Sequence, residues 1–78
     1  MEHEDLIELG FRLCGVEEND PFYKLVFRPP FKFNISSLNG VIDEGSFWLY
    51  GNDIKYTDKI ILKNLIEVLG NEIYNFEN

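Results

Sequence analysis

The chain has 78 residues, which is the length of one small domain. Hydrophobic residues make up 45% of it and charged residues 27%, a globular composition that is too apolar for a disordered tail. Fourteen acidic against seven basic residues give a net charge of −7, which argues against a general binder of nucleic-acid phosphates.

The first predicted element is a short helix over residues 2–9. Gly10 suits the left-handed position that ends a helix, and Phe11 would then reach back to contact Leu6. A strand over residues 11–16 follows. The opening of the chain is therefore predicted to be a capped helix that turns directly into a sheet.

The middle of the chain is predicted to form two strands and a long turn. Residues 22–28 form the first of these strands, and Pro29-Pro30 lies in a connection because proline supplies no ladder donor. Residues 31–36 alternate strictly between apolar and polar side chains, which predicts the next strand. Residues 37–45 contain two turn signals, Asn39-Gly40 and Asp43-Glu44-Gly45, so we expect a turn region there, with a brief pairing of Val41-Ile42 between them.

The last third of the chain predicts two short strands and a helix. The strands cover residues 47–50 and 54–56. Thr57 suits the helix N-cap, and the helix covers residues 58–69 with a broad apolar stripe. The apolar residues of the tail, residues 71–78, indicate that it packs on the body of the domain.

This order of elements predicts one α+β domain over residues 1–78. Its two layers are an antiparallel sheet of four or five strands and two helices on one face of that sheet. The inner, helix-facing side is expected to carry Tyr23, Leu25, Phe27, Phe31, Phe33, Ile35, Phe47, Leu49, Ile54 and Tyr56. The helices would supply Leu6, Leu9, Ile61, Leu65, Ile66 and Leu69 to the same core.

The opposite side of the predicted sheet has no helix to cover it. Two helices cannot cover both faces, so aromatic residues on this side would form an exposed patch, which on a small protein usually marks a contact surface. Tyrosine and tryptophan are also the side chains most enriched at binding hot spots. The predicted partner-binding residues are Phe22, Lys24, Val26, Lys32, Trp48 and Tyr50.

Three occupants of this side remain open: the protein's own loop or tail, a second copy in a homodimer, or a foreign protein. Residues 21–42 carry three bases and no acid, whereas residues 1–20 carry seven acids and one base. Lysines beside aromatic rings are typical of sheets that stack single-stranded nucleic acid. The acidity of the rest of the chain argues against a nucleic-acid partner.

The acidic residues suggest an alternative function, in which carboxylates mimic DNA phosphates and occupy the basic groove of a nucleic-acid-binding protein. The ordinary explanation of a charge of this size is solubility. The residues expected to carry the mimicry are Glu17, Glu18, Asp20, Asp43, Glu44 and Asp53.

No residue pattern predicts a reaction, a metal site, a cofactor or a small-molecule substrate, so we expect a protein that is not an enzyme. His3 is the single histidine and lies in the first residues, where chain ends fray. Cys14 is the single cysteine, which excludes an intrachain disulfide. The acidic start lacks the features of a secretory signal and no segment is apolar enough to span a membrane, so we expect a cytoplasmic protein.

Three segments carry a resemblance to a known group of proteins. They are Leu9-Gly10-Phe11, Phe47-Trp48-Leu49-Tyr50-Gly51 and the helix from Leu62 to Leu69. Together they resemble small uncharacterised proteins of bacteriophages and mobile elements, which pair an early LGF with an FWLYG-type strand and a C-terminal amphipathic helix. The resemblance implies no activity and no functional residue. It favours a phage accessory role, including inhibition of a host defence protein.

Overall fold

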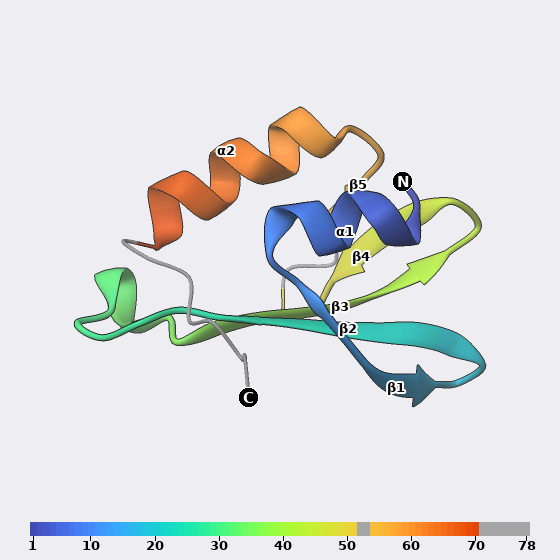
Figure 1. Ribbon diagram of the computed structural model, residues 1–78, viewed down its shortest axis with the longest axis horizontal. Helices are drawn as coiled ribbons and strands as arrows, with labels where there is room; N and C mark the ends of the chain where they lie inside the picture. Colours follow the sequence, from blue (N-terminus) through green and yellow to red (C-terminus); the bar gives the residue numbers. More distant parts are fainter. Residues whose placement is uncertain (52–53, 71–78) are drawn as a thin grey trace.

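The protein is a two-layer α+β structure with both helices on one side of an antiparallel sheet (Figure 1). The computed structural model describes residues 1–51 and 54–70. The sheet order is β1-β2-β3-β4-β5, so each strand pairs with its neighbours in sequence. The predicted fold class is confirmed. The elements are α1 (His3–Leu9), β1 (Arg12–Glu17), β2 (Asp20–Val26), the 3-10 turn η1 (Lys32–Asn34), β3 (Ser37–Asp43), β4 (Ser46–Leu49), β5 (Ile54–Tyr56) and α2 (Lys59–Leu69).

Helix α1 ends as the sequence predicts. Gly10 has a φ of 108°, and its amide donates to the carbonyl of Ile7 at 3.1 Å. The amide of Phe11 donates to the carbonyl of Leu6 at 3.0 Å. This pair of bonds is the Schellman motif, and it satisfies two carbonyls that the helix leaves without partners. It also turns the chain from α1 into β1.

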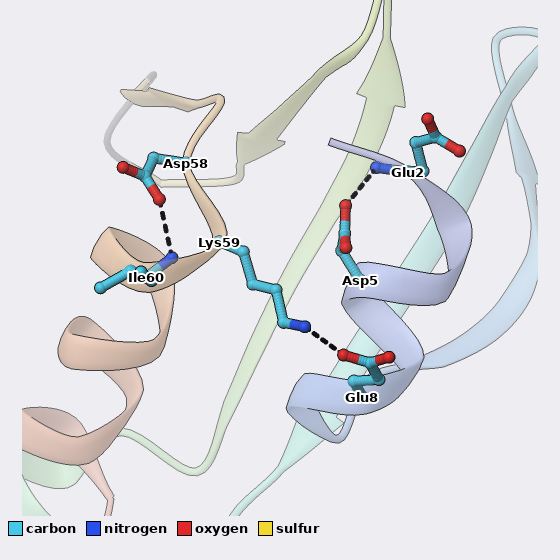
Figure 2. Close-up of polar contacts among 6 residues, drawn as sticks. All are labelled: Glu2, Asp5, Glu8, Asp58, Lys59 and Ile60. Carbon is cyan, nitrogen blue, oxygen red and sulfur yellow. Dashed lines mark hydrogen bonds and ion pairs between the residues drawn. The ribbon is translucent and has the colours of Figure 1, made fainter.

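The two helices are joined to each other and capped by side chains (Figure 2). Asp58, rather than the predicted Thr57, is the N-cap of α2, and its carboxylate accepts from the amide of Ile60 at 2.9 Å. Lys59 donates to the carboxylate of Glu8 on α1. This hydrogen bond raises the pKa of the Lys59 ammonium. This ion pair links the last turn of α1 to the first turn of α2.

The core lies between the helices and the sheet. Leu6, Leu25 and Phe47 have no measurable exposure. Its buried members are Leu6, Leu9, Phe11, Tyr23, Leu25, Phe27, Leu38, Phe47, Leu49, Leu62 and Ile66.

Four predicted core residues are exposed instead. Ile54 is 44% exposed because β5, which holds it, is the edge strand of the sheet. Ile61 is 56% exposed because α2 presents Leu62 and Ile66 to the sheet, which places Ile61 on the flank of the helix. Phe31 and Phe33 are 42% and 69% exposed because the segment that holds them is not part of the sheet.

The strand predicted over residues 31–36 is wrong. It follows the cis peptide between Pro29 and Pro30, and its centre is the turn η1. Phe33 and Asn34 have φ values of 56° and 58°, which is left-handed backbone and not an extended strand. Residues 31–36 therefore alternate between apolar and polar side chains without forming a strand of the sheet.

The third strand is β3, in the region predicted as a turn. Gly40, part of the apparent Asn39-Gly40 turn signal, lies within this strand. A Cβ at Gly40 would lie 2.4 Å from the carbonyl oxygen of Trp48 and 2.6 Å from the ring of Phe47. Glycine is required there because the neighbouring strand and ring approach the backbone closely. The second turn signal was read correctly, since Glu44 and Gly45 form the β3–β4 hairpin turn.

Two further predictions fall outside the described residues. They are the packing of the tail, residues 71–78, and the inner part of the turn at residues 52–53.

We predict that Gly40→Ala destabilises the domain by about 1–3 kcal/mol, because the added methyl group overpacks the core against backbone that cannot move freely. Thermal and urea unfolding followed by circular dichroism would measure the loss. Asn64→Ala, on the exposed side of α2, is the control and should leave the stability within about 0.5 kcal/mol of wild type. Equal stability of Gly40→Ala and wild type would contradict the close packing at this position.

Candidate functional site

The register of the sheet forms a row of residues across its outer face, the side away from the helices. Residues that pair directly across adjacent strands project their side chains to the same side of the sheet. The middle row, as we name it, consists of Gly15, Phe22, Val41, Trp48 and Lys55, one residue from each strand.

The aromatic side chains of this region contact one another and remain open to solvent. Trp48 is 36% exposed and Tyr50 is 47% exposed. The rings of Phe22 and Tyr50 stack with their centroids 5.8 Å apart. The Lys55 ammonium lies 5.7 Å from the centre of the Trp48 ring, within the range of a cation–π contact. Val41, between these side chains, is only 8% exposed.

The predicted pleat of β4 is confirmed. Phe47 and Leu49 are 0% and 3% exposed and belong to the core. Trp48 and Tyr50 alternate with them and therefore face away from the helices. The orientation on which the predicted surface depends is thus present in the structure.

Two charged rows flank the middle row. On one side, Arg12 of β1 pairs with Lys24 of β2, which pairs in turn with Asn39 of β3. On the other side, Glu17 pairs with Asp20 at the β1–β2 hairpin, and Asp43 ends β3 at the neighbouring hairpin. We name these the basic row (Arg12, Lys24 and Asn39) and the acidic row (Glu17, Asp20 and Asp43).

The electrostatics of Tyr50 agree with this placement of the acidic row. Desolvation raises the pKa of the Tyr50 hydroxyl, and the carboxylates of Glu17, Glu18 and Asp20 raise it further. Carboxylates act in this way only when they lie near the phenol, since surface charges are screened with distance. Two members of the acidic row, Glu17 and Asp20, therefore act on the Tyr50 hydroxyl.

Five of the six predicted partner-binding residues gather on the outer face. They are Phe22, Lys24, Val26, Trp48 and Tyr50. Lys32 is the exception, because it lies on η1, beyond the end of the sheet, and not on the strand that the sequence predicted. Val41 is not among the predicted residues, because the sequence predicts only a brief pairing of Val41-Ile42 within a turn region, whereas both belong to β3.

The predicted acidic residues also come together in part. Antiparallel strand order places the β1–β2 and β3–β4 turns at the same end of the sheet (Figure 1). That end carries Glu17, Glu18, Asp20, Asp43 and Glu44. Asp53 lies outside the described residues.

One polar pair was not foreseen from the sequence. His3 Nδ1 lies 2.6 Å from the hydroxyl of Tyr23, whose side chain is 1% exposed. Burial and the charge of Glu4 raise the pKa of this hydroxyl. The hydrogen bond gives a buried phenol its polar partner and ties α1 to β2. His3 is thus part of the packing between layers and not of a frayed end.

We also searched the described residues for metal-binding groups, a reactive thiol and a membrane-spanning helix. No group of three or more His, Cys, Asp or Glu side chains within residues 1–51 and 54–70 is placed to hold a metal ion. Cys14 is exposed at the irregularity in β1, and its thiol lies 3.5 Å from the carbonyl oxygen of Arg12. No described helix combines the length and the apolar composition needed to cross a membrane.

The chain was compared with protein-family models, with curated proteins and with solved structures, and none of them matches it. The candidate surface therefore stands on the geometry of this structure alone.

We predict that residues of β4 differ in their stability cost according to the face they occupy. Phe47→Ala should cost about 3–5 kcal/mol because it opens a cavity in the core. Trp48→Ala and Tyr50→Ala should each cost about 1 kcal/mol and leave the domain folded, because both rings are partly solvated. Chemical unfolding of the variants gives the comparison. A loss at Trp48 as large as that at Phe47 would contradict the assignment of faces.

Proposed function

We propose that this chain is a non-enzymatic protein–protein interaction module that binds through the outer face of its sheet. The observation that carries the proposal is the helix-free aromatic surface formed by Phe22, Trp48 and Tyr50. Contiguous exposed apolar surface on a small protein is costly in water unless another molecule covers it.

The composition of the surface supports a protein as its ligand. Tyr50 and Trp48 combine apolar area with one polar atom each, as do the residues that dominate protein interfaces. Val26, which is half-buried, adds aliphatic surface beside the rings. Charged side chains border the apolar centre, which is the usual arrangement of a polar rim around an interface core.

The resemblance to bacteriophage and mobile-element proteins supplies a setting for this function. In that setting the chain is an accessory protein that acts in the cytoplasm of a bacterial host, and a host protein is among its binding partners. No reaction enters the proposal, because the surface is made of stacking and packing groups.

A second candidate function is an acidic mimic of DNA. It is favoured by one observation, the meeting of five carboxylates at one end of the sheet. In this function Glu17, Glu18, Asp43 and Glu44 would occupy the basic groove of a host defence protein that binds nucleic acid.

The proposed function predicts that binding depends on Trp48 and Tyr50. The full chain and a Trp48→Ala/Tyr50→Ala variant would be compared for self-association and for proteins captured from extracts of the cells that encode the chain. We expect the variant to weaken binding about tenfold or more, since hot-spot residues contribute about 2 kcal/mol or more each. Circular dichroism verifies that the variant is folded.

The matched control is Ile60→Ala/Val68→Ala on α2, where the two side chains are 65% and 60% exposed. It removes exposed apolar area from the opposite side of the molecule and should leave binding unchanged. Equal losses in both double variants would contradict a binding site on the outer face. The acidic mimic would be supported instead if both double variants bind normally and binding is lost when four carboxylates are neutralised, in Glu17→Gln/Glu18→Gln/Asp43→Asn/Glu44→Gln.

A further inference from the structure

The outer face has a symmetric arrangement of opposite charges about its middle row. On β2, Asp20 lies two residues before Phe22 and Lys24 lies two residues after it. The irregularity in β1 lets that strand repeat the pattern, because it brings Arg12 opposite Lys24 while Glu17 stays opposite Asp20. One end of strands β1 and β2 thus carries positive charge on the outer face, and the other end carries negative charge.

The third strand continues the same arrangement. Asn39 and Asp43 lie two residues on either side of Val41, which belongs to the middle row. An amide therefore lies in the basic row at β3, and a carboxylate lies in the acidic row. Asn39 is a hydrogen-bond donor that a carboxylate can use.

We propose that the outer face binds the outer face of a second copy of this chain, in a two-fold symmetric dimer whose axis runs along the middle row. The proposal rests on the proposed function and names the protein that the surface binds. Rotation about this axis reverses the strand direction, so it lays the basic row of one copy over the acidic row of the other. Lys24 then meets the partner's Asp20, and Arg12 meets the partner's Glu17.

Charge selects this arrangement over the other symmetric one. With a two-fold axis parallel to the strands, each residue would keep its position along the strand direction. The basic row of one copy would then lie on the basic row of the other, and the acidic row on the acidic row. Like charges opposite each other are destabilising at an interface. An axis along the middle row instead pairs the rings of Phe22 and Trp48 with their own copies and gives each charged row its opposite.

The local charge balance also permits two acidic chains to meet on this side. The whole chain carries a net charge of −7, which opposes association elsewhere on its surface. Among the strand residues of the outer face, the acids Glu17, Asp20 and Asp43 are matched in number by Arg12, Lys24 and Lys55, while Glu18 and Glu44 lie in the adjoining turns.

Lys55 lies on the axis itself, at the edge strand. Its ammonium is held over the Trp48 ring of its own chain. The two-fold axis brings this side chain toward the partner's Lys55, and it is the one like-charge contact of the proposed arrangement.

The size of the face predicts a weak dimer. Strands of seven residues are about 23 Å long, and five strands at about 4.8 Å spacing are about 19 Å wide. A contact of this footprint is at the small end of specific interfaces. We therefore expect a dissociation constant in the micromolar range, which falls within reach of sedimentation analysis.

The test is a charge exchange within one strand, followed by sedimentation from about 1 µM to about 1 mM. Lys24→Glu alone and Asp20→Lys alone should each weaken the dimer about tenfold or more, because symmetry places two like-charge contacts in every dimer. The double variant Lys24→Glu/Asp20→Lys should return the dissociation constant to within about threefold of wild type. In one chain these residues lie about 13 Å apart, so restoration reports contact between two copies.

Circular dichroism and thermal unfolding verify that each variant is folded. Ile60→Ala/Val68→Ala should dimerise like wild type. The proposal is overturned if wild type is monomeric at about 1 mM, whichever other occupant covers the face. It is also overturned if the double variant is as weak as the single variants, or if the single variants dimerise normally.

These failures are distinguishable from failure of the proposed function. A monomeric wild type whose capture of a host protein still depends on Trp48 and Tyr50 would remove the second copy and retain the binding surface. If wild type neither dimerises nor captures a host protein through Trp48 and Tyr50, the binding surface is contradicted as well. A host protein that used the same face would compete with the second copy, and its addition would then dissociate the dimer.

Discussion

The two-residue alternation of β4 is the constraint on which the rest of the structure depends. Phe47 and Leu49 pack under the helices, so Trp48 and Tyr50 must face the other way. A shift of one residue would exchange the two pairs and expose Phe47 and Leu49, two members of the buried core. The packing of the hydrophobic core therefore fixes both the fold and the composition of the outer face.

The charge pattern of the outer face depends on register and could not be read from the sequence. The aromatic members of the surface were predictable, because alternation within a strand assigns them to a side. The two charged rows become visible only when neighbouring strands are aligned, and the irregularity in β1 decides that Arg12 lies opposite Lys24. Lys32 was misplaced for a related reason, since its assumed strand does not exist.

The parts of the fold that local chemistry determines were predicted well. Gly10 ends α1 and the apolar stripe forms α2, because capping and helical periodicity act over a few residues. The third strand was predicted in the wrong place, since residues 31–36 alternate like a strand while Gly40 resembles part of a turn. The close approach of Phe47 to Gly40 is a contact between two paired strands, and neither local signal contains it.

The most direct test of the account is the pattern of nuclear Overhauser effects from the single tryptophan and its neighbour in β4, measured in dilute solution. The account predicts contacts from the Trp48 indole to Val41 and to Lys55, and from the Phe47 ring to Leu62 or to other residues of the helical core. Contacts from the indole to α2, with a solvated Phe47 ring, would contradict it.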